Sequence, residues 1–212
     1  MYKRNRQRFL CARRVAEQHE RELDNVFHRR PLLIGNCVLL FGRKDSHFPL
    51  HALVGPDWPC MLGTNILIIV PTVLFLIKVA TALSLAVVII GTVSLALLLG
   101  VFIATACTDP GIVFSSPSET SDEEKFELSS EVAMLKCGQC NIRRPSTACH
   151  CYECNVCVER LDHHCPWTGK CIGAKNIRLF YAFLWMLTAH IAFVVVSCVY
   201  AWATKVDTFS WG

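Results

Sequence analysis

Two apolar stretches dominate the pattern of hydrophobic and polar positions along this chain. The first runs from Met61 to Cys107, contains a single charged side chain, Lys78, and has no polar face at helical spacing. Because a bilayer core of about 30 Å needs roughly 20 helical residues, we expect two membrane-spanning helices near residues 61–79 and 83–106, joined by a tight hairpin. The alternative, one buried helical hairpin in a soluble core, would normally keep a polar face.

The second apolar stretch extends from Leu179 to Thr204, lies between Arg178 and Lys205, and predicts a third span. Its only strongly polar side chain is His190. An ionisable group inside a membrane is a functional candidate by default. A neutral, hydrogen-bonded histidine at a seam between helices is the commoner case, so we assign His190 no role.

The polar segments predict the orientation of the spans. Residues 1–30 are rich in lysine and arginine, which the positive-inside rule places on the cytosolic side. Two crossings then return the chain to the cytosol, where thiols stay reduced. We therefore expect a basic cytosolic N-terminal segment (1–60), transmembrane helices 1 and 2 (61–107), an acidic linker (108–136), a cytosolic cysteine-rich domain (137–178), transmembrane helix 3 (179–204) and a short tail (205–212).

Two local signals lie outside the apolar stretches. Leu32–Ile34 and Cys37–Phe41 flank the turn-forming pair Gly35-Asn36 and predict a small hairpin. The sequence Thr108-Asp109-Pro110-Gly111 predicts a sharp stop to the second helix.

Composition agrees with a membrane protein. Apolar residues make up 53% of the chain, above the roughly 45–50% of soluble domains, and the mean hydropathy is +0.39. The formal net charge of +4 is mild. Residues 115–162 are net acidic, which does not suit a phosphate backbone, so we expect no nucleic-acid partner.

Cysteines supply the candidate chemistry. The chain has 13 of them, densest between Cys137 and Cys171, and a reducing compartment makes this cluster metal-binding or catalytic rather than disulfide-linked. Its repeated C-x-x-C spacings and interspersed histidines are typical of structural zinc. Because the cluster has few apolar residues, metal binding must provide much of its folding free energy. The predicted fold is an α-helical transmembrane bundle with a small zinc-bound module of short β-hairpins and loops.

The cluster offers more ligands than two tetrahedral sites need. One of the neighbouring residues His163 and His164 should be free, because both cannot comfortably point at one metal. A free imidazole beside the Cys165 thiol, preceded by Asp162, has the composition of a base, a nucleophile and an orienting acid. Spacing alone leaves open a purely structural finger, in which all of these residues are ligands or fillers.

The motif that contains these residues resembles a known family. Asp162-His163-His164-Cys165, followed by Pro166-Trp167 within this cysteine ladder, resembles the DHHC family of protein S-acyltransferases. The resemblance extends from Cys137 to Phe180. Further matching positions are Arg144-Pro145, Cys171-Ile172-Gly173, Asn176 and the Asp109-Pro110-Gly111 segment after the second span.

The resemblance implies roles that spacing does not assign. It implies that Cys165 is the nucleophile, that His163 is the free base, and that Asp162 orients this base. The implied ligands of the two structural Zn²⁺ ions are, for one ion, Cys137, Cys140, His150 and Cys157, and for the other, Cys151, Cys154, His164 and Cys171.

The resemblance also implies the substrates. Family members take a long-chain acyl group such as palmitoyl from acyl-CoA onto the cysteine, and then pass it to cysteines of substrate proteins at the membrane surface. The spans would hold the acyl chain. Five basic residues are candidates for contact with the coenzyme A phosphates: Arg143, Arg144, Lys170, Lys175 and Arg178. Basic anchoring at the membrane accounts equally well for Lys175 and Arg178.

This sequence departs from the family pattern in three ways. Cys149 is an additional thiol beside His150, and Lys170 stands where an uncharged polar residue is commoner. The family has a fourth span followed by a TTxE motif, and this sequence reaches Gly212 without either. We therefore expect a fragment or a natural short form. The rival hypothesis is a catalytically inactive, membrane-anchored zinc module that acts as an adaptor.

Overall fold

The structure is a computed structural model that describes residues 32–41, 52–114 and 134–205. The chain divides into two units, Met1–Leu32 and Leu33–Gly212, and almost all described residues belong to the second. The predicted basic segment before residue 32, the acidic stretch 115–133 and the tail beyond residue 205 lie outside the described residues.

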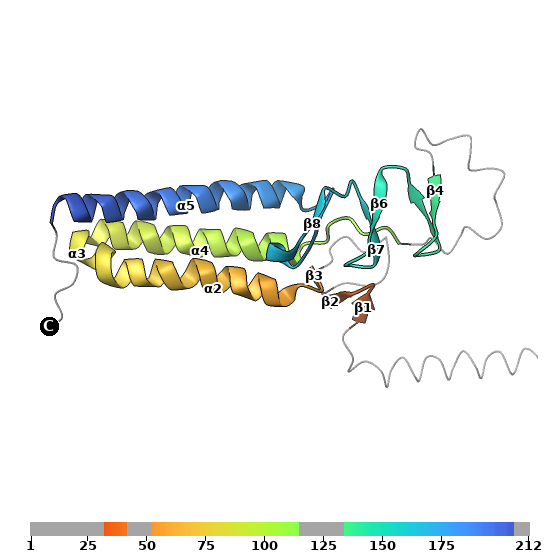
Figure 1. Cartoon of the computed structure of the whole chain (residues 1–212), viewed down its shortest axis with the longest axis horizontal. Coiled ribbons are helices and arrows are strands. Elements are labelled where there is room, and N and C mark those ends of the chain that lie inside the picture. The colour runs from red at the N-terminus through yellow and green to blue at the C-terminus, as the bar shows by residue number, and fades with distance from the viewer. Residues whose placement is uncertain (1–31, 42–51, 115–133, 206–212) are drawn as a thin grey trace, which may run out of the picture. The chain divides into compact units, whose positions relative to one another are not determined.

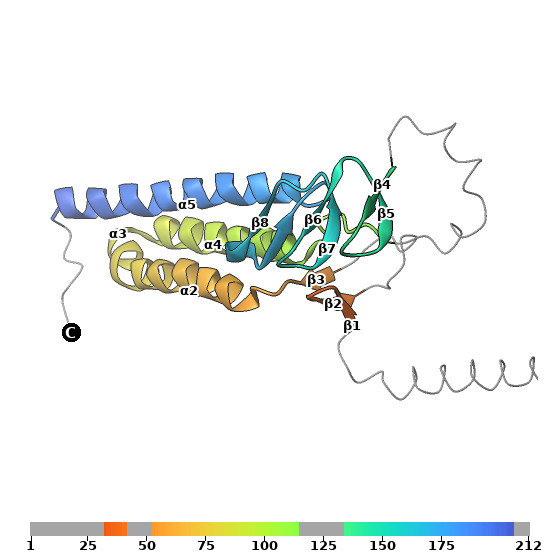
Figure 2. The ribbon, with the colours of Figure 1, turned by 45° about the vertical axis from the view of Figure 1, so that its right-hand side comes forward.

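Within the described residues, three helices are long and apolar enough to cross a membrane, as the sequence predicted. The first span, Trp58–Leu83, is made of α2 (Trp58–Phe75), the π-helical segment η1 (Leu76–Ala80) and α3 (Thr81–Leu83). The second is α4 (Leu85–Cys107), and the third is α5 (Ile177–Ala203). Figures 1 and 2 show the three spans side by side.

The first span differs from its predicted bounds at both ends. It begins at Trp58 rather than Met61, with a proline in its first turn, where the missing N–H costs nothing. It also continues to Leu83, and the chain turns only at Ser84. The backbone of Ser84 is extended, and its Oγ accepts a hydrogen bond of 3.4 Å from the N–H of Val87. Ser84 is therefore the N-cap of α4.

Side chains of all three spans meet in the bundle. Phe102 of α4 packs on Phe183 of α5, with ring centroids 5.0 Å apart. His190 of α5 lies 3.0 Å from Thr72 Oγ1 of α2 through Nε2, and 2.9 Å from Ser94 Oγ of α4 through Nδ1. Because both ring nitrogens have hydroxyl partners, this histidine links the three spans as a satisfied polar group.

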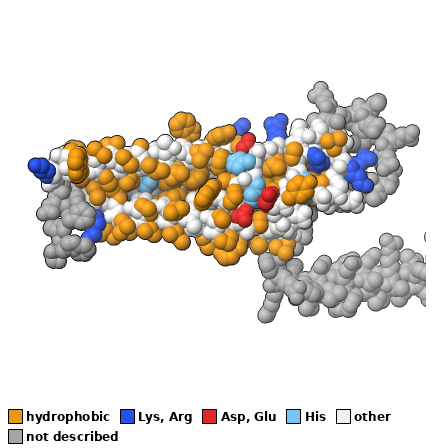
Figure 3. Space-filling view, in the orientation of Figure 1, with side chains coloured by type: hydrophobic (Ala, Val, Ile, Leu, Met, Phe, Trp, Pro, Cys, Tyr) orange, Lys and Arg blue, Asp and Glu red, His pale blue; other side chains and the backbone are white. Residues whose placement is uncertain are grey.

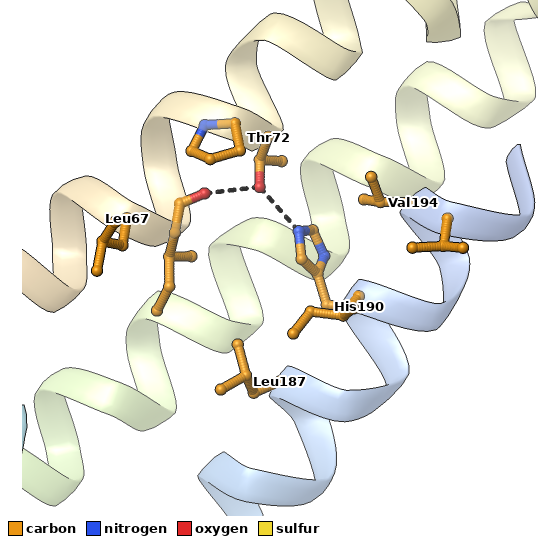
Figure 4. A pocket seen from close by; sticks show the side chains of 9 residues that line it. Leu67, Thr72, Leu187, His190 and Val194 are labelled. Carbon is orange, nitrogen blue, oxygen red and sulfur yellow. Dashed lines mark hydrogen bonds between the residues drawn. The ribbon is translucent and has the colours of Figure 1, made fainter. Parts of the chain in front are cut away.

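His190 also borders a mostly apolar pocket of about 240 Å³ between α2 and α5. In Figure 4 the imidazole of His190 points toward Thr72, to which it is hydrogen-bonded. The lining residues are Leu67, Ile68, Pro71, Thr72, Leu187, His190, Ile191, Val194 and Val195.

The module at one end of the spans is built from short strands, as expected (Figures 1 and 2). A three-stranded sheet of order β1-β2-β3 comprises Leu32–Ile34, Cys37–Phe41 and Ala52–Val54. Three antiparallel pairs follow, β4–β5, β6–β7 and β8–β9. Their strands are Met134–Cys137 and Ile142–Pro145, Ala148–Cys151 and Val156–Glu159, and His163–Cys165 and Lys170–Ile172.

The β1–β2 hairpin was predicted, and the structure adds where it packs. Leu39 and Leu53 form one hydrophobic cluster with Val156, Val158 and other buried residues of the cysteine-rich hairpins. The segment before the first span therefore supplies core that the cysteine-rich residues lack. The described strands β1–β3 therefore pack as part of the module.

Candidate metal centres and active site

The short strand β8 separates two kinds of chemistry. Successive side chains of a strand point to opposite faces, so His163 and Cys165 share one face and His164 lies on the other. In the register with β9, His164 pairs with Cys171 and Cys165 pairs with Lys170. The three-residue strand therefore presents His164, a possible metal ligand, on one face and the His163 imidazole with the Cys165 thiol on the other.

Eight cysteines and histidines form two groups that could hold a metal ion, and within each group the ligand atoms lie within 4.8 Å of one another. The groups are Cys137, Cys140, His150 and Cys157, and Cys151, Cys154, His164 and Cys171. Sulfur and nitrogen atoms bound tetrahedrally at about 2.0–2.3 Å from zinc are about 3.3–3.8 Å apart. The separations of 3.2 Å from Cys140 Sγ to His150 Nδ1 and 3.5 Å from Cys171 Sγ to Cys154 Sγ approach that range. This donor set suits zinc.

The thiols of the second group influence one another's ionisation. The pKa of Cys154 is lowered to about 2, chiefly because the Cys171 thiol donates a hydrogen bond to it. Burial raises the pKa of Cys151 to about 11. Burial also lowers the pKa of His164, but its hydrogen bond with Asp57 and the charge of Cys154 outweigh burial and raise it overall. Thiolates this close repel one another, and a divalent cation would offset the repulsion.

Cys165 is left out of both groups of described ligands. Its side chain is buried, and the residue is 6% exposed. On the same face of β8, His163 Nδ1 lies 2.7 Å from Asp162 Oδ2. The His163 ring packs edge-on against Phe180 at the start of α5, with centroids 5.2 Å apart. If the carboxylate accepts a hydrogen bond from Nδ1–H, the Nε2 lone pair of His163 stays available to take a proton.

The turn after Cys165 is held by the beginning of the first span. This turn, η2 (Pro166–Thr168), leads into Gly169. Thr64 Oγ1 of α2 donates to the Trp167 carbonyl at 3.0 Å, and the Asp57 N–H donates to the Gly169 carbonyl at 3.2 Å. The position of the β8–β9 hairpin therefore depends on contacts with the beginning of the first span.

Gly55 permits this close approach, and its replacement provides a stability test. A Cβ at residue 55 would collide with the Gly169 carbonyl oxygen. We expect Gly55→Ala to reduce the free energy of unfolding by about 1–3 kcal/mol, measured as thermal unfolding of the purified protein in detergent. Gly63→Ala in α2 is the matched control, because nothing lies within 4 Å of its added Cβ. Equal unfolding temperatures for the two variants would contradict the contact.

Lys170 corrects one expectation from the sequence. Its side chain is fully buried, and its ammonium donates to the carbonyls of Leu53 at 3.0 Å and Thr108 at 2.6 Å. Burial lowers its pKa to about 8. The expectation that Lys170 contacts coenzyme A phosphates is wrong, because the group is committed to joining β3, the end of α4 and β9. Lys175 pairs with Asp109 at 2.7 Å.

The sequence interpretation missed Asp57. Its Oδ2 lies 2.7 Å from His164 Nε2, across 107 positions of sequence. The spacing of cysteines and histidines reveals ligands that lie close together in sequence. Asp57 lies before the first span, far from that motif, so spacing could not reveal it. Figure 3 shows carboxylate and imidazole side chains gathered on this face where the spans meet the module, between the apolar surface of the helices and the basic side chains of the hairpins.

The fold and the site define a class of protein. It is a membrane protein with three apolar spans, whose segment between the second and third span carries two Cys₃His groups and a separate cysteine with an imidazole and a carboxylate.

Comparison with known proteins then shows which proteins the chain is similar to. Residues 131–212 match the family model for DHHC palmitoyltransferases. It is 33% identical over 158 residues to palmitoyltransferase ZDHHC18 of Rattus norvegicus, an alignment covering 62% of this chain and 40% of that protein. It is 36% identical over 103 residues to palmitoyltransferase ZDHHC17 of Rattus norvegicus, covering 48% and 17%. The alignments thus span less than half of these relatives.

Proposed function

We propose that this protein is a protein S-palmitoyltransferase that uses Cys165 as its nucleophile. One observation carries the proposal: the cysteine of the Asp-His-His-Cys motif lies outside both metal-ligand groups, on the face of β8 that it shares with His163. Asp162 is the orienting acid of the base, through its 2.7 Å contact. The DHHC domain and the palmitoyltransferase names of the relatives support the same assignment.

In the first step, the Cys165 thiol gives its proton to His163 Nε2, and the thiolate attacks the carbonyl carbon of the acyl-CoA thioester. The bond between that carbon and the coenzyme A sulfur breaks, and the departing sulfur receives the proton from His163. An unassisted thiol has a pKa of about 8.5 and is only a few per cent thiolate at neutral pH. A general base that accepts the thiol proton during the attack makes such a nucleophile effective.

In the second step, a cysteine thiol of the substrate protein attacks the acyl carbon held on Cys165. His163 accepts the proton of the incoming thiol, and the Cys165 sulfur leaves and recovers a proton. Each step exchanges one thioester for another, so no external energy source is needed. This is two-step covalent catalysis.

The two Cys₃His groups would hold structural zinc, since each supplies four ligands and keeps no position for water. Their chemical contribution would be to fold the hairpins that position the reactive strand. The ligand roles follow the two groups described above: Cys137, Cys140, His150 and Cys157, and Cys151, Cys154, His164 and Cys171.

We also propose that the module faces the cytosol, where the basic N-terminal segment is expected to remain. Acyl-CoA would approach from that side, and its chain would enter the apolar region of the spans. Burying each methylene contributes about 0.8 kcal/mol, so a palmitoyl tail would be held strongly. Substrate proteins would present cysteines at the same membrane surface.

The test is acyl-adduct formation by the purified protein in detergent or lipid nanodiscs. Incubation with labelled palmitoyl-CoA is expected to give one hydroxylamine-sensitive adduct per chain, and the label should then move to a thiol peptide anchored in the membrane. A protein that holds two zinc ions but forms no adduct would favour the adaptor hypothesis and contradict the transferase.

A further inference from the structure

We propose that Asp57 is the outer carboxylate of the second metal centre, and that it orients His164 while joining the first membrane span to that centre. The inference rests on the proposed zinc occupancy. It gives a positioning role to a residue outside the cysteine-rich domain.

The two ends of the His164 ring face different partners. Nδ1 lies 3.5 Å from Cys151 Sγ, 3.4 Å from Cys154 Sγ and 3.7 Å from Cys171 Sγ. Nε2 lies 2.7 Å from Asp57 Oδ2. A neutral imidazole has one N–H, and a carboxylate at Nε2 holds the proton there. The Nδ1 lone pair is then free for a metal, which is the arrangement in which outer carboxylates support metal-bound histidines.

Asp57 does not cap α2 with its side chain, although it stands at the N-cap position. It occupies the N-cap position of α2, where an aspartate commonly accepts hydrogen bonds from the first turn. Its side chain makes no such bond. Its carboxylate instead reaches His164, and its backbone N–H donates to the Gly169 carbonyl of the same hairpin. Side chain and main chain of one residue therefore join the start of the first span to the β8–β9 hairpin.

The first metal centre provides an internal comparison. Its histidine, His150, turns Nδ1 toward Cys140 Sγ at 3.2 Å and Cys157 Sγ at 3.9 Å. Within the described part of the chain, the His150 ring has no carboxylate partner, and it packs against Tyr152 with centroids 4.9 Å apart. The effect of Asp57 should therefore be confined to one of the two ions.

Asp57→Asn tests the role through zinc retention. Purified variants are challenged with a chelator of known affinity, and zinc release is followed with a metal-sensitive dye. An amide is neutral and holds the Nε2 proton less firmly. We expect the affinity for one ion per chain to fall by about 10–100-fold, while the other is released as in the unmodified protein.

Two matched variants distinguish the effect of the Asp57 carboxylate on zinc retention from other effects of substitutions nearby. Asp162→Asn changes the same kind of carboxylate–imidazole pair at His163, which is in neither ligand group, and should leave zinc release unchanged. Thr64→Val removes a side-chain hydrogen bond between the first span and the hairpin, and should also leave zinc release unchanged. If Thr64→Val weakened zinc as much as Asp57→Asn, docking of the span rather than the carboxylate would be responsible, and the proposal would be overturned.

The remaining outcomes are also decisive. Normal retention of both ions by Asp57→Asn overturns the role of Asp57 and leaves the proposed function standing. Absence of zinc from the unmodified protein instead overturns the zinc centres themselves. Should Asp57→Asn fail to fold, Asp57→Glu replaces it. The longer carboxylate would displace the imidazole, so faster release of one ion supports the proposal and unchanged release refutes it.

Discussion

Cys165→Ser is expected to abolish the hydroxylamine-sensitive acyl adduct while both metal ions stay bound. A serine hydroxyl has nearly the size of the thiol but is scarcely ionised at neutral pH, so it cannot replace the thiolate nucleophile. Because Cys165 lies outside both ligand groups, the substitution removes reactivity and leaves the hairpins intact. Adduct formation with labelled palmitoyl-CoA and zinc content per chain are the two measurements.

Cys149→Ser is the matched control for this experiment. Between Cys137 and Cys171, Cys149 is the other cysteine outside the two ligand groups, and it is exposed, whereas Cys165 is buried. Its loss should leave the adduct at the unmodified level. An adduct that persists in Cys165→Ser and disappears in Cys149→Ser would reassign the nucleophile.

His163→Ala and His164→Ala are expected to have different consequences although the residues are neighbours. Loss of the base at 163 should slow adduct formation by about 10²–10⁴-fold, with zinc content unchanged. Loss of a ligand at 164 should release one ion and destabilise the module, since binding of a structural zinc contributes about 10–16 kcal/mol in small zinc-finger domains. Adduct kinetics and zinc content distinguish the two.

The geometry of β8 is the reason for this separation. The Asp162 carboxylate lies against one imidazole and the Asp57 carboxylate against the other, on opposite faces of the strand. Zinc loss from His163→Ala, with zinc retained in His164→Ala, would mean that the base and ligand roles must be exchanged.

Much of the architecture could be predicted because its signals are local. A continuous apolar stretch identifies a span without reference to the rest of the chain, and three spans were predicted and found. Span ends were less accurate, because they depend on single residues such as the N-cap Ser84 and on contacts with other segments. The first span begins at Trp58, and near this end Asp57 and Thr64 contact the turn that follows Cys165. Apolarity alone does not reveal these contacts.

The site was predictable to the extent that its residues lie in one short cysteine- and histidine-rich segment. The contacts that support this segment come from distant parts of the sequence. Lys170 illustrates this limit: in sequence it is a basic residue beside the module, but in the structure its ammonium is buried between two backbone carbonyls. Asp57 shows the opposite error: it contacts a candidate metal ligand, but nothing near it in sequence indicates a metal centre.

The core shared by β1–β3 and the cysteine-rich hairpins has a consequence for biosynthesis. Asn36 reaches the Glu153 carbonyl across 117 positions, and Leu53 shares a cluster with Val156 and Val158. The ribosome delivers β1–β3 first and their partners only after two helices have entered the bilayer. Contacts of such long sequence separation form slowly. The early strands therefore lack these apolar partners at least until translation has passed residue 158.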